Sequence, residues 1–116
     1  MNTDKLNTRV LNKTENSFEL EVVFPMDCGF FDGHFPELPL LPGVVQTHLA
    51  IRFSEVHLEK KTVFAGFKSI KFFTPIFPDS KVILQCQYEP TKKQLGFQYS
   101  GNGHVYSKGV VVMKDV

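Results

Sequence analysis

The stretch FDGHFPELPLLPGVVQ, residues 31–46, decides how this sequence folds. Three prolines and two glycines fall within residues 30–43, which excludes a regular helix or strand there and predicts a loop with a fixed backbone. Pro42 suits the first turn of a helix, because its missing N–H would be unpaired there. His57 would then lie near the end of that helix, where a cation suits the dipole, so we expect a capping or surface group. The apolar residues that follow the loop recur at helical spacing and predict one helix over residues 42–58: Val45, Leu49, Phe53 and Val56.

The rest of the chain has the patterns of β-strands. Apolar and polar residues alternate over residues 18–24, and residues 6–11 form a plausible first strand of a hairpin with them. Four further strands are expected after the helix, with a hairpin turn at 101–103: residues 63–74, 82–88, 95–99 and 104–113. One helix and a run of antiparallel strands predict a single α+β domain over residues 1–116, in which a sheet of five to six strands wraps the helix.

Composition excludes several classes of protein. The chain has 116 residues, 42% of them hydrophobic, which suits one folded domain with its own core. Its 13 basic and 12 acidic side chains leave a net charge of +1, so a nucleic-acid partner is not indicated. The two cysteines, Cys28 and Cys86, form no disulfide or zinc pattern and are interpreted as small apolar side chains. With no signal-peptide pattern and no membrane-length apolar run, we expect a cytoplasmic protein without a membrane span.

The loop and the start of the helix combine two groups that suit an acyl-thioester site. His34 can accept a proton near neutral pH, because an imidazole has an ordinary pKa of about 6.5. Gly43 would open the helix, where its backbone N–H can donate to a carbonyl at the positive end of the helix dipole. From the residues alone, a structural role for a single loop histidine is the alternative.

The same residues form a longer motif. Residues 33–36 read GHFP, Pro39 follows, and residues 41–44 read LPGV. This pattern resembles the GHFPxxPxxPGV signature of the hotdog-fold β-hydroxyacyl-(acyl carrier protein) dehydratases, the FabA/FabZ-like family. Residues 64–79 are similar to the family's FAGI…FKxPVxPGD stretch, so the resemblance covers nearly all of residues 28–114.

The resemblance implies an activity and its partners. A dehydratase of this family converts 3-hydroxyacyl chains, carried as thioesters on acyl carrier protein, to trans-2-enoyl thioesters in fatty-acid or polyene-type lipid biosynthesis. Residues 41–46 and 50–52 are most similar to the small dehydratases encoded with aryl-polyene gene clusters. No metal or diffusible cofactor is implied, because phosphopantetheine arrives with the substrate. A homodimer with two sites at its interface is implied, or a pair with a second dehydratase-like subunit.

The resemblance also assigns residues to the site. His34 matches the catalytic histidine, and Gly43 matches the glycine whose N–H binds the thioester carbonyl. Family members carry a carboxylate fourteen residues after the histidine, and here that position is His48. In the family the two side chains of one site come from different subunits. We expect the acyl chain to contact apolar residues around the motif, although core packing explains the phenylalanines equally well: Phe31, Phe35, Pro42 and Val44.

Three hypotheses account for His48. In the first, a protonated His48 donates to the departing C3 hydroxyl while neutral His34 removes a C2 proton. In the second, dehydration has been lost, and the protein is an acyl-carrier-binding partner of another dehydratase. In the third, the fold hydrolyses acyl thioesters, with Glu55, two turns along the helix, helping a water to attack.

Overall fold

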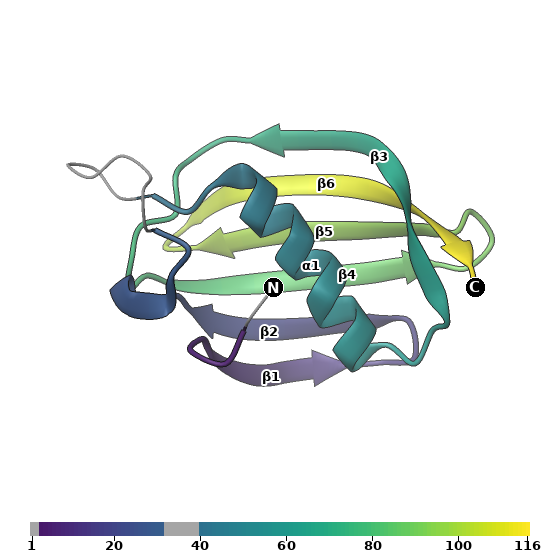
Figure 1. Ribbon diagram of the computed structural model, residues 1–116, viewed down its shortest axis with the longest axis horizontal. Coiled ribbons are helices and arrows are strands. Elements are labelled where there is room, and N and C mark those ends of the chain that lie inside the picture. Colours follow the sequence, from purple (N-terminus) through teal and green to yellow (C-terminus); the bar gives the residue numbers. More distant parts are fainter. Residues whose placement is uncertain (1–2, 32–39) are drawn as a thin grey trace.

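One α-helix lies across one face of a six-stranded sheet in the computed structural model, which describes residues 3–31 and 40–116 (Figure 1). The elements in chain order are β1 (Asn7–Lys13), β2 (Ser17–Val23), the 3-10 helix η1 (Met26–Cys28), α1 (Gly43–His57), β3 (Thr62–Phe72), β4 (Lys81–Glu89), β5 (Gln94–Gly101) and β6 (His104–Asp115). The strand order is β1-β2-β4-β5-β6-β3, and every neighbouring pair is antiparallel. This is the hotdog arrangement, so the expected fold class is confirmed.

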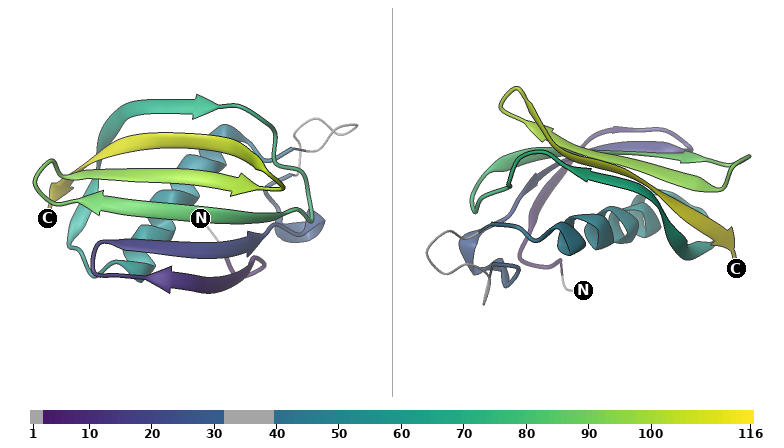
Figure 2. Two further views of the ribbon diagram at one scale, coloured as in Figure 1. Left: turned by 180° about the vertical axis from the view of Figure 1, so that it is seen from behind. Right: turned by 90° about the horizontal axis from the view of Figure 1, so that it is seen from above.

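The alternating residues of the strands form the core. On β2 and β4 the buried partners lie directly opposite each other, as Leu20 does with Leu84, and Val22 with Val82. Cys86 is free and belongs to the same buried layer, where burial raises the pKa of its thiol. These side chains face α1, and the sheet curves around the helix (Figure 2).

The helix begins and ends within one residue of the prediction. Pro42 precedes α1 as its N-cap with an extended ψ of 144°, and Leu58 follows it as the C-cap. The Pro42 carbonyl accepts hydrogen bonds from the N–H groups of Val45 and Gln46 at 3.1 and 3.2 Å. Pro42 thus lies one position before the first helical residue, because its carbonyl accepts the first hydrogen bonds of the helix.

Strand β3 is long, apolar and exposed, unlike the other strands after the helix. It pairs with β6 at one edge of the sheet, and its register shifts twice, between Phe64 and Gly66 and between Phe67 and Ser69. Phe67 is 56% exposed and Phe72 is 54% exposed. The rings of Phe64 and Phe67 lie 4.9 Å apart between centroids. An apolar edge of this kind normally has a partner that covers it.

The helix ends at a histidine whose surroundings differ from the expected surface cation. The ring of His57 lies 5.3 Å from that of Phe18 and 6.4 Å from that of Phe53, measured between centroids. Burial, with a smaller effect of the Lys13 charge, lowers the pKa of His57 below its usual value. Packing against the aromatic rings therefore outweighs the attraction of the helix dipole for a cation.

This lowered pKa predicts a loss of stability on acidification. The unfolded chain binds a proton on His57 below about pH 6.5, before the folded chain does, so the free energy of unfolding should fall from that pH until the folded pKa is passed. Urea unfolding of the wild type and His57→Gln at several pH values measures this difference. Parallel curves, or a wild type that gains stability on acidification relative to the variant, would contradict it.

Candidate active site

The first turn of α1 presents backbone N–H groups without a described partner. Pro42 makes no side-chain cap, and within residues 3–31 and 40–116 no acceptor lies within hydrogen-bond distance of the Gly43 N–H. Such an N–H group lies at the positive end of the helix dipole, where it favours an oxygen that carries negative charge. Because Gly43 has no side chain, a ligand can approach this amide closely.

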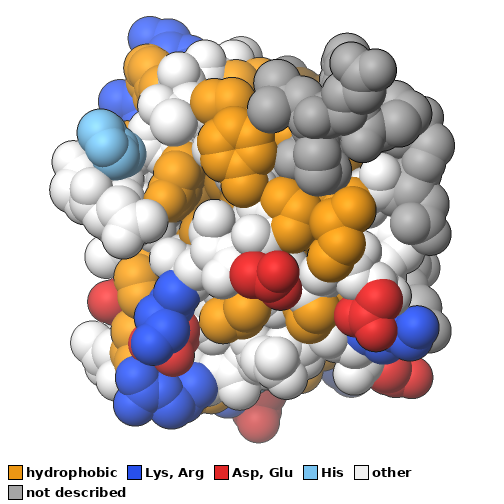
Figure 3. All heavy atoms as spheres, turned by 90° about the vertical axis from the view of Figure 1, so that its left-hand side faces the viewer, with side chains coloured by type: hydrophobic (Ala, Val, Ile, Leu, Met, Phe, Trp, Pro, Cys, Tyr) orange, Lys and Arg blue, Asp and Glu red, His pale blue; other side chains and the backbone are white. Residues whose placement is uncertain are grey.

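A cavity of about 390 Å³ lies beside this turn. Three segments line it: Leu40 and Leu41 before the helix, Gly43 and Gln46 in its first turn, and residues 72–75 at the end of β3 and directly after it. Hydrophobic side chains gather on this end of the molecule (Figure 3). The site therefore joins an amide donor to a mainly apolar hollow, which is the combination that a carbonyl on an apolar chain requires.

The ring of Phe72 covers Gly43. A Cβ atom added to Gly43 would lie 2.5 Å from Cζ of Phe72, well inside van der Waals contact. Phe72 is half-exposed, so its ring has room to move, but a movement changes the shape of the cavity that both residues line. A side chain at position 43 would therefore have to displace the Phe72 ring and so alter the cavity.

The described residues that the sequence assigned to the site have different surroundings in the structure. His34 and Phe35 lie outside the described residues. Phe31 is 3% exposed and belongs to the core, as the packing alternative for it predicted. Val44 is 62% exposed on the solvent side of α1, one turn before His48. Of the assigned residues, Gly43 lines the cavity, and Pro42 precedes it as the N-cap.

His48 and Gly43 point in different directions from the same helix. Five residues at 3.6 per turn place them about 140° apart around the helix axis. His48 is exposed, does not line the cavity beside Gly43, and has no hydrogen bond or ion pair within the described part of the chain. One chain by itself therefore does not bring His48 to the Gly43 amide.

Sequence reasoning missed two groups in the cavity wall. Gln46 is 3% exposed, and Ser107 Oγ donates a 2.7 Å hydrogen bond to its Oε1 atom. The only sequence signal for Gln46 was a polar residue on the buried side of the predicted helix. Phe72 and Phe73 were interpreted as strand residues, because no local pattern shows that the end of β3 lies against a helix 29 residues earlier in the chain.

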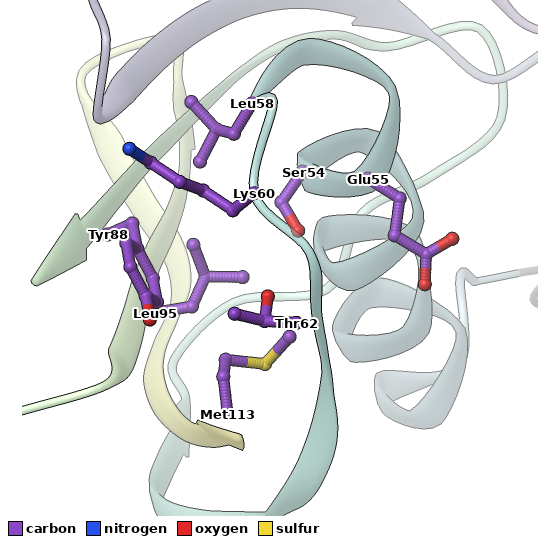
Figure 4. Close-up of a pocket in the computed structure, with 8 residues that line it drawn as sticks. All are labelled: Ser54, Glu55, Leu58, Lys60, Thr62, Tyr88, Leu95 and Met113. Atoms are coloured by element: carbon purple, nitrogen blue, oxygen red, sulfur yellow. The ribbon is translucent and has the colours of Figure 1, made fainter. Parts of the chain in front are cut away.

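A second hollow, at the other end of α1, is too small for a ligand. Its volume is about 10 Å³, which holds at most one water molecule, and Ser54, Tyr88 and Met113 are among its lining residues (Figure 4). Glu55 extends away from the other labelled side chains there, and its carboxylate pairs with Arg52 at 3.2 Å. Glu55 is thus not brought near the Gly43 amide, which disfavours its proposed role in thioester hydrolysis.

Another hollow, of about 570 Å³, is larger than the cavity beside Gly43 and lies on the face of the sheet away from the helix. Polar residues dominate it: Lys71 and Lys108 are cross-strand partners, and Gln98 Nε2 donates to Gln85 Oε1 at 3.4 Å. Its lysine and glutamine side chains suit water better than an acyl chain. Size alone therefore does not identify the site, and the smaller apolar cavity at Gly43 is the better candidate.

The described residues contain neither a candidate metal site nor a membrane-spanning helix. In residues 3–31 and 40–116 no group of three or more His, Cys, Asp or Glu side chains could hold a metal ion. No helix in the same ranges is long and apolar enough to cross a membrane.

The fold and the helix N-terminus place the chain among the hotdog proteins, and solved structures agree. A chain of the dehydratase heterocomplex ApeI:P from Xenorhabdus doucetiae superposes with a TM-score of 0.83 at 23% identity, covering 92% of this chain and 97% of that one. An uncharacterized protein from Erwinia carotovora subsp. atroseptica gives a TM-score of 0.80 at 28% identity, with coverage of 95% and 94%.

Sequence comparison then identifies the family. Residues 10–110 match the model of the ApeI-like family, described as ApeI dehydratase, so this chain belongs to that family. A 3-hydroxyacyl-[acyl-carrier-protein] dehydratase FabZ from Nitratidesulfovibrio vulgaris is 32% identical over an 87-residue alignment, with 64% of this chain covered. The matched part spans 56% of that relative's length. The dehydratase family expected from the GHFP motif is confirmed.

The contact between Gly43 and Phe72 predicts a coupling in stability. Gly43→Ala in the wild type must displace the Phe72 ring, whereas in a Phe72→Ala background the three nearest atoms to the new methyl group are gone. We expect a coupling free energy of about 1 kcal/mol in a double-mutant cycle measured by urea unfolding. Additive effects of the two substitutions would show that the ring does not press on position 43.

Proposed function

We propose that this protein is a 3-hydroxyacyl-(acyl carrier protein) dehydratase that forms trans-2-enoyl thioesters. The observation that carries the proposal is Gly43 at the helix N-terminus, which lines an apolar cavity and whose N–H makes no hydrogen bond within residues 3–31 and 40–116. Membership of the ApeI-like family supports the reaction class. The substrate would arrive in the cytoplasm on acyl carrier protein, with phosphopantetheine as its arm and with no other cofactor.

The reaction needs a base, an acid and a donor to the thioester oxygen. His34 would remove a proton from C2, and the electron pair left behind would form the C2–C3 double bond. The C3–O bond then breaks, and the oxygen takes a proton from His48 and leaves as water. During this step negative charge develops on the thioester oxygen, where the Gly43 N–H would hold it. The step uses His34 neutral, as the base, and His48 protonated, as the acid.

The positions on α1 favour a site shared between two chains. His48 faces about 140° away from Gly43 on its own helix, so the acid of one site would come from a second chain. Strand β3 offers a surface for that second chain, because its exposed phenylalanines and its free edge have no cover in the described part of the protein. A homodimer joined along β3 would bury these rings and bring two helices close together.

A pair with a different subunit is the second candidate. One of the solved structures that resemble this chain belongs to the dehydratase heterocomplex ApeI:P from Xenorhabdus doucetiae. In such a pair the partner could supply the carboxylate that His48 replaces, and this chain would bind the acyl carrier without catalysing dehydration alone. The presence of histidine at position 48 is the observation that favours this candidate.

Substitutions at position 48 separate these candidates. If His48 is the acid, the wild type should convert a 3-hydroxyacyl-carrier protein with loss of one water, detected by mass spectrometry, and the rate should peak at mildly acidic to neutral pH. His48→Phe should lose about 10²–10⁴-fold in rate, and His48→Glu should keep or raise activity, because a carboxylate there can donate to the same hydroxyl. An inactive wild type that gains dehydration as His48→Glu would instead identify a binding partner.

The shared site predicts recovery of activity when two inactive variants are mixed. His34→Ala and His48→Phe should each be inactive as homodimers. After mixed refolding, half of the dimers carry one of each chain, and each such dimer keeps one intact site, so about a quarter of wild-type activity should return. Kinetic assay of the mixture measures this, with each variant refolded alone as the control. No recovery would place both histidines of a site in one chain.

A further inference from the structure

A fully buried polar cluster lies behind the Gly43 turn. Ser107 on β6 donates to Oε1 of Gln46 at 2.7 Å, and Nε2 of Gln46 donates to the Leu41 carbonyl at 3.1 Å. Tyr99 on β5 donates its hydroxyl to the main-chain carbonyl of Gln46 at 2.7 Å. Ser107 and Tyr99 are both 0% exposed. Burial raises the pKa of Tyr99, so its hydroxyl remains protonated and able to donate.

The cluster fixes the chain just before the helix. The Leu41 carbonyl is held by Gln46, while the Leu41 N–H donates to the Ile76 carbonyl at 2.7 Å in the connection between β3 and β4. Both the N–H and the carbonyl of Leu41 therefore make hydrogen bonds within the protein. Pro42, with its ring-restricted φ of −60°, is the one residue between this fixed peptide and Gly43. The direction of the Gly43 N–H follows from these constraints.

The cluster depends on the amide of Gln46. An apolar side chain of similar length at position 46 would fill the same space but would leave the buried Ser107 hydroxyl and the Leu41 carbonyl without this partner. The amide of Gln46 binds the carbonyl before the N-cap, while Gly43 lines the cavity and its N–H has no hydrogen-bond partner within the described residues. We propose that Gln46 is a positioning residue, which together with Ser107 aims the Gly43 N–H at the substrate carbonyl. The catalytic part of this inference rests on the function proposed above.

The main test compares two buried serines. Ser107 and Ser54 are 0% and 7% exposed, and each donates a 2.7 Å hydrogen bond, Ser107 to Gln46 and Ser54 to the Ile51 carbonyl. Ser54 lies near the opposite end of α1, beside the small cavity there (Figure 4). Ser107→Ala and Ser54→Ala should therefore lower the midpoint of thermal unfolding to a similar degree, while only one of them touches the Gly43 turn.

Kinetics then separate positioning from stability. With a 3-hydroxyacyl-carrier substrate, Ser107→Ala should lower kcat about tenfold with little change in KM, because a misplaced donor costs transition-state stabilisation more than binding. Gln46→Met, which keeps the length of the side chain and removes its hydrogen bonds, should also lower kcat. Ser54→Ala should keep the wild-type kcat. An equal fall in kcat for Ser54→Ala would overturn the inference.

A second measurement, which needs no catalysis, keeps this test independent of the proposed activity. In ¹H–¹⁵N spectra of the ¹⁵N-labelled protein, the Gly43 amide signal should move in Ser107→Ala and stay in place in Ser54→Ala. If the wild type is inactive on every carrier substrate, the proposed function fails, and the amide signal still decides whether Ser107 and Gln46 position Gly43. A Gly43 signal that is unchanged in Ser107→Ala would overturn the inference.

Discussion

The hydrogen bonds of Gln46 tie the first turn of α1 to the middle of the sheet. They are buried among apolar side chains, and they join β6, the helix and the segment before it into one rigid unit. Within the described residues, Asn16 Oδ1 is the only buried side-chain oxygen or nitrogen without a partner, so this cluster is fully satisfied. A satisfied buried network specifies one arrangement, because any shift would leave a polar group unpaired at a cost of about 1–3 kcal/mol.

Strand β3 has no cover within residues 3–31 and 40–116. Helix α1 lies over the centre of the sheet, and the edge strand beyond β6 keeps its phenylalanines exposed. Phe72, the last residue of that strand, also packs on Gly43. A second chain docked on this edge, as proposed above, would therefore also affect the shape of the cavity at the helix N-terminus.

Much of the fold could be predicted from the sequence, because alternation and helical spacing are local. The helix began one residue later than expected, since Pro42 acts through its carbonyl as the N-cap. The strand order could not be predicted, because β3 pairs with β6 across more than 30 residues, and its two register shifts hide the alternation. The candidate site was found only in part. Gly43 was recognised from a motif, whereas Gln46 and Phe72 gained their roles from contacts with segments distant in sequence.

The central claim is that an acyl thioester binds with its carbonyl on the Gly43 N–H. A crystal structure with an amide analogue of 3-hydroxyacyl-pantetheine, in which nitrogen replaces the thioester sulfur, tests it most directly. We expect the carbonyl oxygen at about 2.7–3.2 Å from the Gly43 nitrogen, with the acyl chain beside Phe72. An analogue bound instead on the outer face of the sheet, near Lys71 and Lys108, with the Gly43 amide unoccupied, would contradict the account.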